Sequence, residues 1–293
     1  MVCLAAMVAA STSAKAQEVT ITLKSDWTWI GSPIVEEVDL ASALGSFTPQ
    51  IGDIIKTQGG ISYYIAGYGW FGSITKLEPG KGYKYFSTRT EPVNITFWNH
   101  AYVDLGLPSG ILWATCNVGA DAPEDYGDYF AWGDTETKSS YGWNTYQFCN
   151  GTGDTFIKYC SNSAYGYFSD TLTILNPKDD AASINWGSGW RMPTKAEWEE
   201  LYNNTTVIWT TQNGVIGSLF TASNGNSLFL PAAGRCSGSN LGLVGTGGYY
   251  WSESLNVDSP NRAWGFGITN SNCMVSTAMR YYGLSVRAVH PGL

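Results

Sequence analysis

The sequence has few charged residues and no cluster of basic ones. Asp, Glu, Lys and Arg make up 14% of the 293 residues, and the formal net charge at pH 7 is -8. Proteins that bind nucleic acid or anionic membranes usually present a patch of Lys and Arg. We therefore exclude both as the main partner. The chain after its first residues also lacks the ~20 consecutive apolar residues that a membrane-spanning helix needs, so no membrane span is expected.

Metal-ligand spacings are lacking as well. The sequence has no C-x-x-C motif and no Cys/His spacing typical of zinc sites. His100 and His290 are far apart, and we interpret both as ordinary surface residues. An odd number of cysteines follows residue 16, so they cannot all pair, although Cys149 and Cys160 could close a short loop. The cysteines in question are Cys116, Cys149, Cys160, Cys236 and Cys273.

Residues 1–16 form a short apolar run that ends in small residues. This composition is typical of a secretory signal peptide, cleaved before Gln17, although the usual basic residues at its start are missing. The alternative is a buried N-terminal helix. We expect an exported protein, either secreted or held at the cell surface.

Aromatic residues and glycines are plentiful. Aromatics make up 14% of the chain and there are 34 glycines, which indicates many strands and turns and a neutral polar surface. In residues 17–97, short β-type runs alternate with Gly-rich turns, and only residues 40–44 look weakly helical. This pattern predicts a small, mainly β module. Exposed aromatics there could stack on sugar rings, but aromatics on short strands more often form a core, which is what we expect.

The C-terminal part, residues 98–293, contains one strong helix signal. Thr194 and Glu197 have the spacing of a capping box, in which each side chain accepts a hydrogen bond from a backbone N–H of the first turn. A helix beginning at Lys195 is predicted. Its expected apolar face consists of Trp198, Leu201 and Tyr202. We interpret the segment 189–201 as scaffold, because a general-acid role for its glutamates needs a carboxylate partner and a pocket that the sequence does not identify.

Other residues are also assigned to the scaffold. Large rings among glycines can anchor loops that have little regular structure. The tryptophans interpreted in this way are Trp113, Trp132, Trp190 and Trp251. Arg191 and Arg287 lie in apolar contexts and need carboxylate or carbonyl partners if they are buried. Asp128 and Asp134 are expected to form turn hydrogen bonds, with calcium binding as the alternative; no other cofactor is expected.

Six short sequence motifs resemble those of a known protein family. They occupy residues 102–119, 126–134, 190–194, 230–234, 249–252 and 284–287. In this order they resemble the Fibrobacter succinogenes major paralogous domain, which is similar to formylglycine-generating enzymes and to the variable proteins of diversity-generating retroelements. The resemblance implies an α+β domain with a C-type lectin-like fold. Phrases within residues 17–97 also resemble an accessory module found in secreted proteins of gut-type Bacteroidetes, to which no chemistry is assigned.

The resemblance leaves several functions open. The related copper oxidases use a cysteine pair near the C-terminus, and here Cys273 alone follows Cys236, so this activity is disfavoured. The sugar-binding phrases of calcium-dependent lectins are missing. A binding or adhesion role remains, with the alternative of a structural surface protein that binds nothing. In retroelement variable proteins, the diversified side chains lie between the Tyr-Trp-Ser and Val-Arg phrases. The ligand-binding residues expected on this basis are Glu253, Asn256, Asp258, Asn261, Asn270, Asn272, Tyr281 and Tyr282. The expected partner is an extracellular glycan or protein, and the oligomeric state is open.

Overall fold

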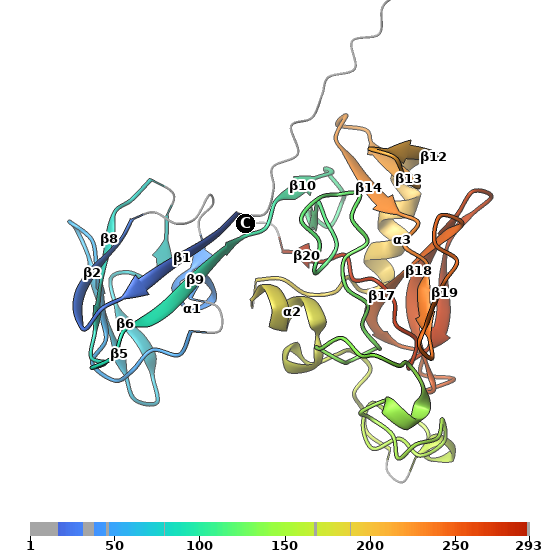
Figure 1. Ribbon diagram of the computed structural model, residues 1–293, viewed down its shortest axis with the longest axis horizontal. Helices are drawn as coiled ribbons and strands as arrows, with labels where there is room; N and C mark the ends of the chain where they lie inside the picture. The colour runs from blue at the N-terminus through green and yellow to red at the C-terminus, as the bar shows by residue number, and fades with distance from the viewer. Residues whose placement is uncertain are drawn as a thin grey trace, which may run out of the picture.

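The computed structural model describes residues 17–31, 38–44, 47–78, 80–166, 169–187 and 189–291. The expected signal peptide, residues 1–16, lies outside them. The described residues form mostly strands, with few helices (Figure 1). The β-rich character expected from composition is therefore present. Among these residues, no helix combines the length and the apolar character needed to cross a membrane.

The N-terminal half has one hydrophobic core. Its main sheet has the order β2-β8-β4-β5-β6. The strands are β2 (Asp26–Gly31), β8 (Tyr83–Ser87), β4 (Ile54–Lys56), β5 (Ile61–Ile65) and β6 (Gly69–Gly72). Two smaller pairs and a short helix complete this half: β1 (Gln17–Leu23) with β9 (Val93–Asn99), β3 (Val38–Asp39) with β7 (Lys76–Leu77), and α1 (Leu40–Ala43). The core lies between the main sheet and these elements and includes Leu23, Ile55, Tyr85 and Ile95.

The described residues of the C-terminal half form four small antiparallel sheets. The first consists of β10 (Tyr102–Asp104), β11 (Leu112–Ala114) and β20 (Val289–His290), and the second of β12 (Thr205–Gln212), β13 (Val215–Ala222) and β14 (Ser227–Pro231). The others are β15 (Arg235–Ser237) with β16 (Asn240–Gly242), and β17 (Gly247–Leu255), β18 (Arg262–Thr269) and β19 (Cys273–Met279). Since β11 pairs with β20, the beginning and the end of this half lie side by side.

The long segment between β11 and β12 is irregular except for short helices. These are η1 (Trp143–Thr145), η2 (Ser163–Tyr165), η3 (Pro177–Asp179), α2 (Ala181–Trp186) and α3 (Lys195–Asn203). In this half only α3 was predicted from the sequence, so α2 is an addition. It begins after Asp180, whose carboxylate accepts a hydrogen bond from the N–H of Ser183 and so caps the helix.

Helix α3 begins at Lys195, as predicted, and the capping box is formed. The hydroxyl of Thr194 accepts from the N–H of Glu197 at 3.1 Å, and the carboxylate of Glu197 accepts from the N–H of Thr194 at 2.7 Å. The buried ring of Trp198 stacks on Phe266 of β18, with a centroid separation of 4.8 Å. Tyr202, expected on the apolar face, is 42% exposed instead.

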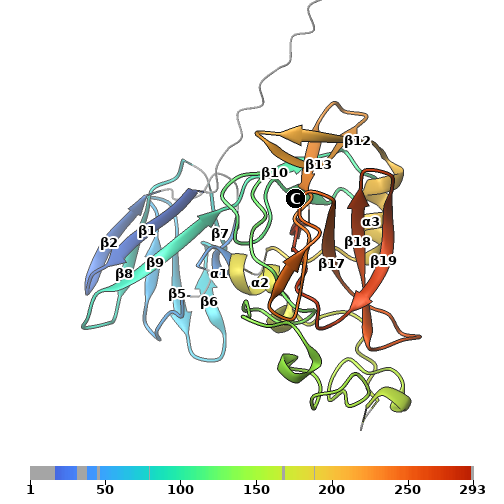
Figure 2. The same cartoon turned by 45° about the vertical axis from the view of Figure 1, so that its right-hand side comes forward.

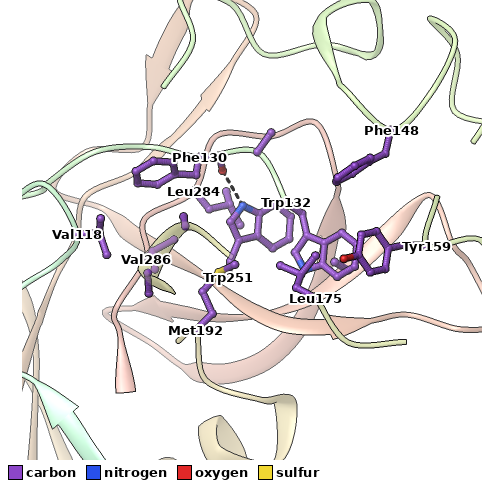
Figure 3. Packing of buried hydrophobic residues seen from close by; sticks show 14 of the residues in the cluster. Val118, Phe130, Trp132, Phe148, Tyr159, Leu175, Met192, Trp251, Leu284 and Val286 are labelled. Atoms are coloured by element: carbon purple, nitrogen blue, oxygen red, sulfur yellow. Dashed lines mark hydrogen bonds between the residues drawn. The ribbon is translucent and has the colours of Figure 1, made fainter. Parts of the chain in front are cut away.

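Buried tryptophans organise the core of the C-terminal half (Figure 3). The indole N–H of Trp251 donates to the carbonyl of Phe130 at 2.7 Å, and that of Trp132 donates to the carbonyl of Ser252 at 2.8 Å. Trp113 packs on Trp198, with a centroid separation of 4.8 Å. The structure buries all of the tryptophans assigned to the scaffold. The ring nitrogens of Trp132 and Trp251 thus tie the segment around residues 130–132 to strand β17.

Buried arginines tie distant segments together. Arg287 is fully buried and donates to the side-chain oxygen of Asn117 and to the carbonyls of Ala114 and Thr115. Its partners are carbonyl and amide oxygens, as its apolar context required. Arg280, which the sequence analysis did not single out, is also fully buried and donates to the hydroxyl of Tyr146 at 2.8 Å.

The expectation for His100 needs correction, and the structure also bears on the cysteines and on the region of the expected domain boundary. His100 was expected on the surface, but it is buried and stacks on Trp186, with a ring separation of 3.8 Å. Burial disfavours its charged form and lowers its pKa to about 4. Cys149 and Cys160 do not pair; the described cysteines are all free. The boundary expected between residues 97 and 98 falls inside β9.

A further correction concerns the N-terminal aromatics, which were expected in the core. Tyr83 and Tyr85 are buried there, but several other aromatic side chains of the main sheet are exposed. The exposed ones are Trp27, Trp29, Tyr63 and Phe71. They lie on the face of the sheet that points away from the core.

Candidate functional site

The residues expected to bind a ligand lie in the sheet β17-β18-β19, in its two turns or just after its last strand. Helix α3 packs against one of its faces, as Figure 2 shows. The turn that joins β17 to β18 lies at one end of this sheet, and the turn that joins β18 to β19 lies at the other. Because β18 has eight residues, about 26 Å separate the two turns.

The expected residues therefore do not form a single surface. Asn256, Asp258 and Asn261 lie in the first turn, whereas Asn270 and Asn272 lie exposed in the second. In the first turn, the side-chain oxygen of Asn256 accepts from the N–H groups of Asp258 and Ser259, which is a turn-forming role. The backbone carbonyl of Asn261 accepts from the N–H of Arg280 and joins this turn to the end of β19.

Glu253 was expected on a loop, but it lies in β17 and is buried. Its carboxylate is 3.9 Å from the guanidinium of Arg191. Arg191 in turn forms a two-armed ion pair with Glu197, at 2.8 and 2.5 Å. Burial raises the pKa of Glu253 to about 7, and Arg191 only partly offsets this effect. Glu253 therefore belongs to the scaffold around the start of α3 and not to an exposed binding loop.

Asp134 and Asp128 also have scaffold positions. Asp134 is buried and forms an ion pair with Lys138. The N–H of Asp128 donates to the carbonyl of Val118, which holds its loop, and burial raises the pKa of its carboxyl group. Within the described parts of the chain, no three His, Cys, Asp or Glu side chains come close enough together to hold a metal ion.

Tyr281 and Tyr282 follow β19 and form the centre of a compact group. Their ring centroids are 4.6 Å apart, and Tyr281 also packs edge-on against Trp143 at 4.7 Å. The guanidinium of Arg235 lies 4.7 Å from the ring centre of Tyr282 and 5.4 Å from that of Tyr249. All five side chains are half-buried, so each keeps part of its surface in contact with solvent. We call this group the aromatic–arginine surface.

The backbone below this surface is fixed by a close approach of two segments. Cys236 of β15 exchanges two backbone hydrogen bonds with Gly283, at 2.7 and 3.1 Å. A Cβ atom at position 283 would lie only 2.7 Å from the ring of Tyr141 and 2.8 Å from the Cβ of Cys236. Position 283 therefore requires glycine. The contact holds Arg235 and Tyr282, the neighbours of these two residues, at a fixed separation.

Exposed apolar side chains occur near the end of β16 and on the sheet beside Tyr249. Leu241, Leu243 and Val244 are exposed on β16 and in the segment after it. On the sheet, Tyr249 is in register with Gly267, and Gly267 with the exposed Met274. Since side chains of directly paired residues point to the same face, Tyr249 and Met274 share a face with only a glycine between them. This part of the sheet is open and rich in apolar atoms.

The chemistry of this surface suits binding. Burial and a hydrogen bond with Tyr282 raise the pKa of Tyr281 to about 12, so its hydroxyl is neutral at physiological pH. Neutral phenols and a guanidinium can stack and donate hydrogen bonds. Of this group, the two tyrosines were expected from the sequence, whereas Arg235, Tyr249 and Trp143 were not. The Tyr-Tyr-Trp run that begins at Tyr249 gave a local signal for one of them.

Cys273 is the residue that bears on the oxidase alternative. It is buried at the start of β19, and its sulfur lies 3.9 Å from the hydroxyl of Ser218. Burial raises the pKa of its thiol, which disfavours the thiolate that copper binding needs. Comparison of the chain with protein-family models, with curated proteins and with solved structures found no match.

Proposed function

We propose that this chain is an exported recognition protein, whose C-terminal half binds an extracellular protein partner through the aromatic–arginine surface. The observation that carries the proposal is the position of Arg235, with its guanidinium against the rings of both Tyr249 and Tyr282. Tyr, Trp and Arg are enriched among the residues that dominate the energy of protein interfaces. Tyrosines also supply large contact areas with few rotatable bonds.

The surroundings favour a protein over a glycan at this surface. The exposed side chain of Met274 shares a sheet face with Tyr249 of the aromatic–arginine surface, and only Gly267 lies between them in register. Met and aromatic residues are typical of interface centres, whereas Lys, Glu and Asp are depleted there. We further propose a C-type lectin-like fold for this half. The two helices, the small sheets and the long loops of residues 115–180 agree with the architecture that the sequence resemblance implies.

The binding experiment uses the full chain on arrays of extracellular proteins and glycans. Every partner found is then titrated with two variants, Arg235→Ala and Tyr282→Ala. We expect each variant to raise the Kd for a protein partner by at least about tenfold, the effect of losing one interface residue of high energy. The matched control is Tyr202→Ala, an exposed ring on α3, which packs against the sheet face opposite to that of Tyr249; it should leave the Kd unchanged.

Two results would contradict the proposal. One is binding that survives both the Arg235 and the Tyr282 substitutions while their thermal unfolding midpoints match that of the parent chain. The other is loss of binding in the Tyr202 control alone, which would place the site on the side of the sheet that α3 covers. A partner that proves to be a glycan and depends on Arg235 would keep the surface but change the ligand class.

The oxidase alternative and export have direct tests. Purified chain incubated with copper and a cysteine-containing sulfatase peptide should form no aldehyde, because Cys273 has no neighbouring cysteine in sequence to complete a pair. Aldehyde formation would replace the recognition proposal with an enzymatic one. Export predicts a mature N-terminus at Gln17, which N-terminal sequencing of the extracellular protein would detect.

A further inference from the structure

The outer face of the five-stranded N-terminal sheet carries an ordered row of apolar side chains. In each strand pair, the facing residues are in direct register. The row runs across all five strands in the order Trp27, Phe86, Ile54, Tyr63 and Phe71. Directly paired residues share a face of the sheet, so these side chains lie in one line. With strands about 4.8 Å apart, the line is about 19 Å long.

This face is open in the described structure. The opposite face is the one covered by β1 and β9, which contribute Leu23 and Ile95 to the core (Figure 1). On the outer face, Trp29 and Phe71 are each 68% exposed. A soluble protein seldom exposes an ordered apolar patch without a binding role. The spacing of the strands is close to the length of one sugar unit, so successive rings of an extended polysaccharide can lie over successive side chains of the row.

A groove of 990 Å³ borders the row at one end of the sheet. A second line of side chains runs parallel to the row across β2, β8 and β4 and consists of Trp29, Lys84 and Lys56. All three side chains line the groove. The ammonium of Lys84 lies 4.2 Å from the ring centre of Trp29, and that of Lys56 lies 4.4 Å from the ring centre of Trp27. Aromatic rings and positive charges therefore occupy one continuous surface.

The groove is basic although the chain as a whole is acidic. Among the described residues, its lining contains the lysines Lys56, Lys76, Lys81 and Lys84 and the carboxylate Glu78, which forms an ion pair with Lys81 at 2.6 Å. The positive charges next to the row are those of Lys56 and Lys84, which lie over tryptophan rings. The rest of the lining is largely polar or glycine. The net charge of the chain is -8, so the pair of lysines Lys56 and Lys84 on this face differs from the acidic character of the whole chain. An anionic ligand complements the groove.

We propose that the N-terminal half binds an acidic polysaccharide, with sugar rings stacked along the row and carboxylate groups at the lysines of the groove. Aromatic faces contribute contact area that does not depend on sugar identity. The lysines add selection for charge, and their contribution falls as salt rises because the Debye length shortens to about 8 Å at 0.15 M. This site is separate from the aromatic–arginine surface, and either can exist without the other.

Native gel electrophoresis of the full chain tests the proposal. The gels contain either polygalacturonate, which carries one carboxylate per sugar, or the same polymer with its carboxylates methyl-esterified. We expect polygalacturonate to retard the chain and the methyl ester to retard it much less. Adding salt to 0.5 M should remove most of the difference. Equal retardation by both polymers, or retardation by neither, would overturn the proposal.

Variants locate the site. Lys56→Gln with Lys84→Gln should raise the Kd for polygalacturonate about tenfold, as expected for the loss of two solvent-accessible charge contacts. Trp29→Ala with Phe71→Ala should weaken binding of both polymers by a similar factor. The matched controls are Lys24→Gln and Tyr68→Ala, since both residues are exposed at the other end of the sheet.

The substituted side chains point to solvent, so the variants should fold, and a thermal unfolding midpoint equal to that of the parent chain verifies this for each. Unchanged retardation of both folded double variants would contradict the assignment of the ligand to this face. Binding lost in the Lys24 or Tyr68 control, and kept in the double variants, would contradict it equally. If this face binds an extracellular protein, and no polysaccharide retards the chain in the gel, the face is a protein interface and the proposal is wrong.

Discussion

Both halves of the chain place aromatic residues on short antiparallel strands, but they use them differently. In the C-terminal half, α3 covers one face of β17-β18-β19, and Trp198 stacks on Phe266 beneath it. In the N-terminal half, the five-stranded sheet has a core on one face only, so Trp29 and Phe71 remain exposed. The comparison shows that a strand pattern alone does not tell a core from a binding face. What decides is whether a second layer covers the sheet.

Replacing a covered ring should have the largest effect. Trp198→Ala removes a fully buried side chain that packs on Trp113 and Phe266 and donates to the carbonyl of Trp251. We expect the free energy of unfolding to fall by about 3–5 kcal/mol, from lost burial and the cavity that remains. Chemical denaturation measures this change. A loss below about 1 kcal/mol would break the comparison, because the covered ring would then behave like an exposed one.

The buried carboxylate of Glu253 gives a pH-dependent prediction. Its pKa is raised from 4.5 to about 7, so the folded state holds the proton more tightly than the unfolded chain. The contribution of Glu253 to the free energy of unfolding is therefore fully present below pH 4.5, and it is lost as the pH rises to about 7. Glu253→Gln should raise the free energy of unfolding at pH 8 by about 3 kcal/mol, since each pKa unit corresponds to 1.36 kcal/mol.

Denaturation of parent and variant at pH 4 and pH 8 checks the sign for Glu253. The two chains should be equally stable at pH 4, where the carboxyl is protonated in the folded and unfolded states. If the variant is less stable than the parent at pH 8, then the ion pair with Arg191 outweighs desolvation, and the stated direction is wrong.

The capping box should have a moderate effect. Thr194→Ala removes the hydroxyl that accepts from the N–H of Glu197 and should cost about 0.5–2 kcal/mol of stability. Thr194→Ser keeps the hydroxyl and serves as the control. An unchanged denaturation midpoint for the alanine variant would show that the interpretation of this segment as scaffold lacks an energetic basis.

Replacing an exposed ring should have the smallest effect. Trp29→Ala and Phe71→Ala each change a side chain that is 68% exposed, so we expect changes in stability within about 0.5 kcal/mol. The thermal unfolding midpoint measures this. A large loss for either variant would mean that these rings stabilise the fold after all and would weaken the case for a binding face.

Local signals predicted part of this fold. The start of α3 followed from Thr194 and Glu197, which interact within one helical turn. The hairpin of β12 and β13 also had a local signal that the sequence analysis passed over, the pair Asn213-Gly214. Both residues have positive φ angles, 47° and 85°, as a two-residue hairpin turn requires.

Other features depend on contacts between distant segments. Arg280 is buried by Tyr146, Tyr159 and Pro260, which lie between 20 and 134 residues away along the chain. Nothing beside Arg280 in the sequence indicates these partners. For the same reason, the set expected between Glu253 and Tyr282 was close in sequence but is divided between two ends of a sheet and a buried strand. Closeness in sequence placed several of these residues in turns, but it did not place them on one surface.

The most direct test of the difference between the two halves is the retardation of one double variant. Trp29→Ala with Phe71→Ala should lose most of the retardation by polygalacturonate that the parent chain shows, while its thermal unfolding midpoint stays equal to that of the parent. This result would separate binding from folding at the same two side chains. Retardation equal to that of the parent, with the fold intact, would contradict the claim that the uncovered sheet face is a binding surface.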